Sequence, residues 1–197
     1  MGLLKYWESL RAPFERSARG RTGSFFLDAA HFVHGAFLGM VWCFVRLFIP
    51  TPSGRKRVNV LGALNAITHE LITVVNETYI NSESVCELLW HLAQTNFTVP
   101  VTLVLDNARY QCCHLVQDFA AFLSIELLYL PSYSPHLNLI ERFWKFVKKQ
   151  CLYSKYYPEF ADFKVGILHC IDQAHEEHKE KLESLLTLNF QSPQKVE

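Results

Sequence analysis

The apolar positions change period along the chain, and that change divides the sequence into two halves. Between residues 24 and 79, short runs rich in Val, Ile, Thr and aromatic residues alternate with turn-forming residues, a pattern typical of strands. The runs are Ser24–Asp28, Leu38–Ile49, Arg57–Asn65 and Leu71–Tyr79. Three or four strands so close together along the chain predict an antiparallel meander.

The second half alternates between helical and strand patterns. Apolar residues at 85, 88, 89 and 92 form a helical stripe that begins after an N-cap at Asn81 or Ser82. We predict helices over Ser82–Asn96, Cys112–Leu123, Leu137–Cys151 and Phe160–Leu188, and buried strands over Val101–Asp106 and Ile125–Leu130. A meander followed by strand–helix–strand–helix predicts an α/β fold with a mixed sheet flanked by helices.

Composition supports a globular core, because half of the 197 residues are apolar. The longest apolar run, Gly35–Val45, is shorter than the roughly 20 residues of a membrane-spanning helix. The N-terminus has scattered charges and no apolar core of a signal peptide. The six cysteines show no CxxC pair and are typical of reduced thiols, so we expect a cytoplasmic protein. A zinc site made of Cys112, Cys113 and His114 is the alternative interpretation for part of this set.

The charges balance at 19 basic and 19 acidic residues, but they are unevenly distributed. Basic residues are concentrated in residues 1–57 and 141–158, and acidic residues dominate elsewhere. Such clusters provide phosphate contacts for nucleic acids, so overall neutrality does not exclude a polyanionic partner. Ordinary solubilising charge is the simpler alternative. The predicted DNA-contacting residues are Arg55, Lys56, Arg57, Arg109, Lys145, Lys148 and Lys149.

Two of the apolar runs end in an aspartate, Asp28 in FFLDAAHF and Asp106 in LVLDNARY. Open α/β sheets bind their ligands at the carboxyl ends of strands. Each Asp alone is explained equally well as a cap of the following turn. Two of them, in a region with few other charged strand residues, favour a site.

A third acid lies near the start of the helix that we expect to begin around Ser134 and Pro135. Asn138, Glu141, Lys145 and Lys148 share one face of this helix. The opposite face is apolar and consists of Leu139, Phe143, Phe146 and Val147. An exposed amphipathic face with a Glu141–Lys145 pair is the alternative to a functional Glu141.

The three acids gain meaning when they are considered together. Carboxylates within about 4 Å repel by roughly 4 kcal/mol per pair at an effective dielectric constant near 20, so a cluster needs a cation or a shared proton. Mg²⁺ prefers oxygen ligands, and pairs of such ions support phosphoryl displacement. Asp28, Asp106 and Glu141 therefore fit phosphodiester chemistry better than zinc hydrolysis.

Three segments carry a resemblance to a known family: FFLDAAHF (25–32), LVLDNARY (103–110) and LPSYSPHLNLIERFWKFVKK (130–149). In these segments the chain resembles the Asp-Asp-Glu catalytic domain of transposases of the mariner superfamily, in its bacterial insertion-sequence branch. The 34 residues between Asp106 and Glu141 match the spacing typical of that superfamily. Two departures are Ala29, where many relatives carry an acid, and Gln111, near the place of a histidine.

The resemblance implies a ribonuclease-H-like fold with a five-stranded mixed sheet. It implies that Asp28, Asp106 and Glu141 are catalytic and bind two Mg²⁺ or Mn²⁺ ions. His31, Asn107 and Asn138 are auxiliary candidates. His31 could assist proton transfer or bind phosphate, and a hydrogen-bonded structural histidine is the simpler alternative. The implied reaction is cleavage of double-stranded DNA at transposon ends followed by strand transfer into target DNA. A homodimer in synapsis, a location at the bacterial nucleoid and no membrane partner are implied with it.

The expected organisation is a linker or helical remnant at 1–23, a catalytic domain at 24–158 and a helical extension at 159–197. Relatives in this family begin with helix-turn-helix modules, and we expect residues 1–23 to be too short for them. Two alternative functions stay open at this point. One is a non-catalytic transposase fragment that acts as a regulator or is a decayed remnant, and the other is a nuclease of the same fold without transposition.

Overall fold

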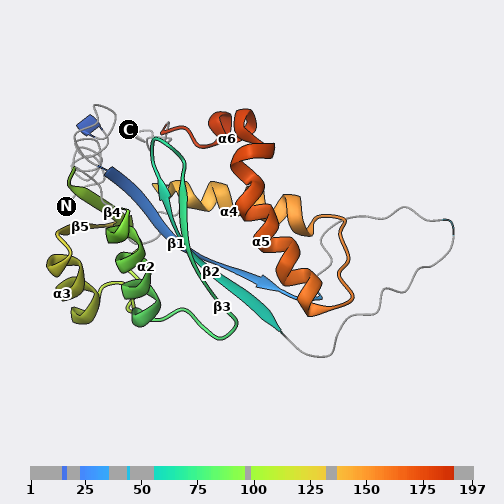
Figure 1. Cartoon of the computed structure of the whole chain (residues 1–197), viewed down its shortest axis with the longest axis horizontal. Helices are drawn as coiled ribbons and strands as arrows, with labels where there is room; N and C mark the ends of the chain where they lie inside the picture. Colours follow the sequence, from blue (N-terminus) through green and yellow to red (C-terminus); the bar gives the residue numbers. More distant parts are fainter. Residues whose placement is uncertain are drawn as a thin grey trace, which may run out of the picture.

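A five-stranded mixed sheet forms the centre of the molecule (Figure 1). The computed structural model describes residues 15–16, 23–35, 44, 56–95, 99–131 and 137–188. The strand order is β3-β2-β1-β4-β5, with antiparallel pairing among β1, β2 and β3 and parallel pairing of β1 with β4 and β4 with β5. The strands are β1 (Gly23–Val33), β2 (Arg57–Asn65), β3 (Leu71–Asn76), β4 (Val101–Leu105) and β5 (Ile125–Tyr129). The predicted mixed sheet with a meander is confirmed.

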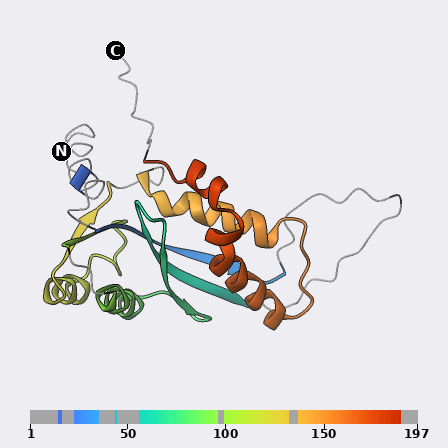
Figure 2. The ribbon, with the colours of Figure 1, turned by 45° about the horizontal axis from the view of Figure 1, so that its top comes forward.

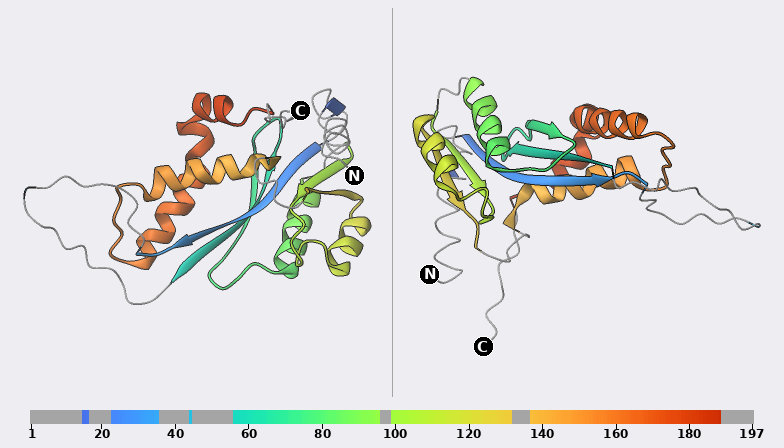
Figure 3. Two further views of the ribbon diagram at one scale, coloured as in Figure 1. Left: turned by 180° about the vertical axis from the view of Figure 1, so that it is seen from behind. Right: turned by 90° about the horizontal axis from the view of Figure 1, so that it is seen from below.

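Helices cover both faces of the sheet, as Figures 2 and 3 show. Side chains alternate between the faces along a strand, so β1 contributes to both cores. Phe25 and Leu27 pack under α2 (Ser82–Gln94) and α3 (His114–Phe122). Phe26 and Phe32 belong to the core under α4 (Leu139–Leu152), α5 (Phe160–Glu177) and α6 (Lys179–Leu185). None of the helices in the described part of the chain is long and apolar enough to cross a membrane.

Helix α4 shows the predicted division of its faces. Leu139, Phe143, Phe146 and Val147 are buried against the sheet and α5, as the apolar stripe predicts. Trp144 is 3 % exposed and belongs to the same core. Lys145 is exposed, whereas Glu141 and Lys148 are partly buried at the edge of the helix. The amphipathic pattern therefore positions Glu141 at the boundary between core and solvent.

Several predicted boundaries differ from the structure. Strand β1 continues past Asp28 to Val33, because its pairing with β2 extends to Val33 although its pairing with β4 ends at Leu27. The predicted single helix over 160–188 is broken at His178, whose φ of −130° leaves the helical region, so α5 and α6 are separate. Helix α4 begins at Leu139 rather than near Ser134, and residues 132–136 lie outside the described residues. The predicted strand at 38–49 also lies outside them.

Candidate active site at the ends of the parallel strands

The register between β1 and β4 brings two of the predicted acids together. Leu27 pairs with Leu105, and this is the last parallel pair between the two strands. Asp28 and Asp106 directly follow it, so they lie next to each other where the parallel pairing of β1 with β4 ends. The two acids are 78 positions apart in sequence but adjacent in the sheet. This is the carboxyl edge at which α/β sheets place their ligands.

The third acid comes from α4, which packs on β1 and β2. Glu141 lies in the first turn of α4, and its backbone N–H donates to the Asn138 carbonyl at 3.2 Å. Its charge acts on the Asp28 carboxyl together with that of Asp106. The structure thus brings all three predicted acids close enough to interact electrostatically.

Asn138 links these elements directly. It is 1 % exposed and precedes α4, but its side chain does not cap the helix. Instead the amide donates to the Leu27 carbonyl on β1 at 3.1 Å. Burial raises the pKa of Asp106, and a hydrogen bond from Asn138 opposes that rise. Asn138 therefore connects Asp106, the strand that carries Asp28, and the start of the helix that carries Glu141.

The electrostatic environment of Asp28 disfavours its charged form. Burial raises the pKa of Asp28 to about 7, and the nearby charges of Asp106 and Glu141 add to the increase. The Ala29 backbone and Lys148 act in the opposite direction without cancelling it. A buried carboxyl group beside two others needs a proton or a cation.

Tyr110 is a further member of this site. Burial raises the pKa of its phenol, and the charges of Asp28 and Asp106 contribute to the shift. The Gln111 side-chain amide donates to the Tyr110 hydroxyl at 3.3 Å, so the phenol keeps its own hydrogen for donation. The Gln111 Oε1 atom is buried and has no hydrogen-bond partner among the described residues. From the sequence alone, Tyr110 directly follows Arg109 after Asp106 and could contact DNA or orient the site.

The predicted DNA-contacting residues have different surroundings. The Lys148 charge acts on Asp28, and the Lys148 ammonium is 5.7 Å from the Phe32 ring centroid. Arg57 holds the Thr78 carbonyl with Nε at 3.0 Å and Nη2 at 2.7 Å. The Lys56 ammonium lies 5.4 Å from the Phe160 ring centroid. Arg109, Lys145 and Lys149 are exposed, and Arg55 lies outside the described residues.

Of the other auxiliary candidates, His31 is separated from the acids by the sheet. It follows Asp28 by three residues on β1, so the two side chains emerge on opposite faces. On that far face its Nδ1 lies 2.7 Å from the Asn59 Oδ1 atom, within hydrogen-bond distance. Asn107 is exposed in the turn after Asp106.

The donor set fits a hard divalent cation. In the described part of the chain, no three His, Cys, Asp or Glu side chains are arranged to hold a metal ion as they stand. Without a cation the carboxyl groups repel one another, and they do not converge on a single metal position in this arrangement. The buried Asn138 Oδ1 atom beside them has no hydrogen-bond partner among the described residues. Carboxylate and amide oxygens are the ligands that Mg²⁺ and Mn²⁺ prefer. The positive charge of Lys148 also acts on Asp28.

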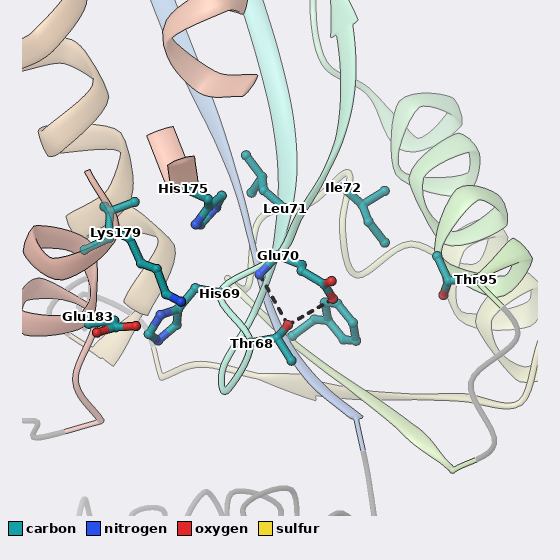
Figure 4. A pocket seen from close by; sticks show the side chains of 11 residues that line it. Thr68, His69, Glu70, Leu71, Ile72, Thr95, His175, Lys179 and Glu183 are labelled. Carbon is teal, nitrogen blue, oxygen red and sulfur yellow. Dashed lines mark hydrogen bonds between the residues drawn. The ribbon is translucent and has the colours of Figure 1, made fainter. Parts of the chain in front are cut away.

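A cavity of about 720 Å³ lies elsewhere in the molecule and contains none of the three acids. It surrounds the turn between β2 and β3 and is lined from α5 and α6 by His175, Lys179 and Glu183 (Figure 4). That turn adjoins the start of β1, because the Ala66 N–H donates to the Ser24 carbonyl at 2.8 Å. The carboxyl cluster lies at the other end of the β1–β4 pairing. The cavity is therefore not the candidate active site.

The fold is that of a ribonuclease-H-like domain, and its three predicted acids lie close together beside the β1–β4 pairing. The sequence model of the DDE superfamily endonuclease family matches residues 45–164, and the chain belongs to this family. The matched segment contains Asp106 and Glu141 and begins after Asp28. The position of Asp28 in the site therefore rests on the strand register. No curated protein shows significant sequence similarity to the chain.

Solved structures of related folds include transposases and integrases. The mariner Mos1 paired end complex with Mg has a TM-score of 0.62 at 15% identity, covering 92% of this chain and 57% of that chain. The catalytic domain of Mos1 mariner transposase gives 0.55 at 14% identity, with 93% and 91% covered. The HTLV-2 integrase catalytic core domain gives 0.52 at 9% identity, with 80% and 88% covered. The chain spans little more than half of the transposase in the Mos1 complexes.

Proposed function

We propose that this chain is a transposase catalytic domain that cleaves DNA strands at transposon ends and joins them to target DNA. The observation that carries the proposal is the parallel pair Leu27–Leu105, which places Asp28 beside Asp106 within reach of the charge on Glu141. Membership of an endonuclease superfamily supports the same chemistry. We further propose that residues 24–158 form the catalytic unit. Helix α5 would complete its core, because Phe163 and Ile167 pack with α4 residues.

Asp28, Asp106 and Glu141 would hold Mg²⁺ or Mn²⁺, with two ions per site. Among structurally similar proteins, Mos1 complexes with Mg and with Mn support a divalent cation. When bound, the ions supply Lewis acidity at the phosphate and favour ionisation of the attacking hydroxyl. Asn138 holds the Asp106 carboxylate in place, and Lys148 offsets part of the negative charge at Asp28. The Tyr110 phenol has its hydrogen available to a phosphate oxygen or a carboxylate.

The partner that we propose is double-stranded DNA, approached from the side of α4 that carries Lys145, Lys148 and Lys149. The Mos1 neighbours are named as strand transfer and paired end complexes, and an HTLV-2 integrase core is described as dimeric. A homodimer that brings two DNA ends together is consistent with both.

The test is cleavage of transposon-end DNA by the 197-residue chain in Mg²⁺ or Mn²⁺. Asp106→Asn is expected to lose nicking by a factor of at least about 10³, because a ligand of the reacting centre is removed. Asp118→Asn makes the same chemical change on the exposed surface of α3 and is expected to cleave normally. Equal cleavage by wild type and Asp106→Asn would reject the site. Strand-transfer products from a donor with a 3′-hydroxyl separate a transposase from a simple nuclease, and an inactive wild type supports the regulator alternative.

A further inference from the structure

The close approach of α4 to the sheet occurs at a glycine directly opposite Asp28. Gly62 on β2 is the antiparallel partner of Asp28 on β1. Residues paired in this way have their side-chain positions on the same face of the sheet. The face is the one covered by α4, since Phe26 and Ala30, two positions before and after Asp28, lie in the α4 core. The missing side chain of Gly62 therefore leaves a gap beside the Asp28 carboxyl.

Trp144 occupies that gap. A Cβ atom on Gly62 would lie 2.7 Å from Cζ2 and 3.0 Å from Cη2 of Trp144, and 3.1 Å from Cδ1 of Ile140. The first distance is shorter than real Cβ atoms show against a neighbour, so α4 would have to move by several tenths of an ångström to admit a methyl group. Because Trp144 is 3 % exposed and packed on all sides, the indole has little room to tilt instead.

The contact uses the size of the indole rather than its hydrogen bonding. The Trp144 Nε1 atom is buried and has no hydrogen-bond partner among the described residues. An unpaired buried donor destabilises a folded protein, so the indole N–H does not contribute to the stability of this contact. The two carbons that reach Gly62 belong to the six-membered ring of the indole. A phenylalanine side chain is shorter and would not reach as far.

The position of this contact couples it to the acids. Ile140 directly precedes Glu141, and Trp144 follows Glu141 by three residues. All three therefore lie on neighbouring turns of one rigid helix. A displacement of the Trp144 ring from β2 moves Glu141 away from Asp28 by a similar amount. At the other end of the same turn, Asn138 ties the helix start to Leu27.

We infer that the Gly62–Trp144 contact is a positioning device for the carboxyl site: the gap at Gly62 fixes how closely α4, carrying Glu141, approaches Asp28. Gly62 and Trp144 are positioning residues that touch neither metal nor DNA. This inference rests on the proposed function, since it concerns how the same three acids are held. Ordinary core packing is the competing explanation, and it predicts a change in stability without a selective effect on the site.

The experiment compares Gly62→Ala, Trp144→Phe and the double variant in the full chain. Mn²⁺ affinity is measured by isothermal titration calorimetry, DNA nicking by gel assay, and folding by circular dichroism and urea unfolding. Gly62→Ala is expected to remain folded and to lose at least about tenfold in Mn²⁺ affinity and nicking, because misplacement by about 1 Å costs up to about 100-fold. Trp144→Phe in the same chain makes room for the methyl group and should restore both readouts to within about threefold of Trp144→Phe alone.

Gly166→Ala is the matched control. A Cβ atom on Gly166 would lie 2.9 Å from Cε1 and 2.9 Å from the hydroxyl of Tyr157, so it also presses a methyl group against an aromatic ring. Gly166 lies on α5, an element that carries none of the three acids, and its substitution is expected to leave Mn²⁺ affinity and nicking unchanged.

Three results would overturn the inference. Wild-type affinity and nicking in Gly62→Ala exclude a positioning role, and so does a loss that Trp144→Phe does not rescue. If Gly62→Ala does not fold, the Trp144→Phe single variant tests the inference instead. It is expected to weaken Mn²⁺ binding by about threefold or more. Wild-type Mn²⁺ binding by this variant would reject the inference. A wild-type chain that neither binds Mn²⁺ nor nicks DNA overturns the proposed function as well. An active wild type with an inactive Asp106→Asn and an unaffected Gly62→Ala overturns the positioning inference alone.

Discussion

The Asn138 side chain donates a hydrogen bond to the main-chain carbonyl of Leu27 at 3.1 Å, across 111 residues of sequence. Leu27 precedes Asp28, and Asn138 precedes the helix that carries Glu141. The same side chain acts on the Asp106 carboxyl. One buried amide therefore joins the three chain segments that supply the acids, and we expect its loss to affect both stability and catalysis.

Asn138→Ala is expected to lower the free energy of unfolding by about 1–3 kcal/mol, because it removes a buried hydrogen bond and leaves the Leu27 carbonyl unpaired. Urea unfolding measures this loss. Nicking of DNA should fall by at least about tenfold, since Asp106 is no longer held. Asn81→Ala removes the capping box of α2 away from the acids and should cost about 1 kcal/mol without slowing nicking. Equal nicking by the two variants would show that Asn138 is only structural.

Asp28→Asn is expected to stabilise the metal-free protein at alkaline pH. The pKa of Asp28 rises from 3.8 to about 7 on folding, so the folded state favours the proton. The corresponding stability is complete below pH 3.8 and is lost as the pH rises through 7. At pH 8 the variant should therefore be more stable than wild type by up to about 4 kcal/mol, and this advantage should shrink toward pH 4.

Urea unfolding in EDTA across this pH range measures the difference. Addition of Mg²⁺ at pH 8 should raise the stability of wild type more than that of Asp28→Asn, because the variant has lost one of the three carboxylates that hold the ions. A stability difference that stays constant between pH 4 and pH 8 would contradict the burial of Asp28.

The sequence was sufficient to predict the order of the strands and helices and to single out three acids that the structure brings close together, for physical reasons that individual residues illustrate. Both β2 and β4 are buried on both faces along almost their whole length, and the apolar residues that this burial requires made both strands predictable. The apolar stripe of α4 predicted which face packs on the sheet. Local spacing also suggested that Asn138 and Glu141 share a helix face.

The tertiary relationships were beyond a single sequence. The pairing of Leu27 with Leu105 is a matter of register, and a shift by one residue would turn Asp28 to the other face. The sequence left His31 open between an auxiliary and a structural role, and only strand geometry places its side chain on the face opposite Asp28, beside Asn59. Gly62 left one signal, since an isolated glycine within a strand marks a close approach of another segment. Which segment approaches was visible only in the structure.

Tyr110→Phe is expected to reduce nicking by about tenfold, with a smaller effect on folding. The Gln111 amide donates to the phenol oxygen at 3.3 Å, so the phenol can still donate its own hydrogen, and the charges of Asp28 and Asp106 act on it. Removal of the hydroxyl deletes this donor and about 0.5–1.5 kcal/mol of stability. Tyr79→Phe, at a side chain 62% exposed, is the control and should change neither quantity. Wild-type nicking in Tyr110→Phe would remove the phenol from the site.

Lys145→Ala is expected to weaken DNA binding without impairing cleavage at saturating DNA. Lys145 is exposed on α4, four residues after Glu141, and contributes sequence-independent phosphate attraction. Measured by fluorescence anisotropy, the slope of log affinity against log salt should decrease by about one. Lys179→Ala changes an exposed lysine beside the separate cavity and should keep the wild-type slope. The same slope in both variants would show that DNA does not follow the α4 face.

His31→Ala is expected to lower stability while preserving cleavage. Asn59 donates through Nδ2 to Asn76 at 3.0 Å, so its Oδ1 atom accepts from His31 Nδ1 at 2.7 Å. Because Asn59 is fully buried, loss of the imidazole leaves a buried acceptor unpaired and should cost about 1–3 kcal/mol in urea unfolding. Nicking should stay within about twofold of wild type, which corresponds to less than about 0.5 kcal/mol in the barrier. Asn76→Ala breaks the same chain of hydrogen bonds at its other end and should reproduce this behaviour. A His31→Ala variant of wild-type stability that no longer nicks DNA would instead place the imidazole in the reaction.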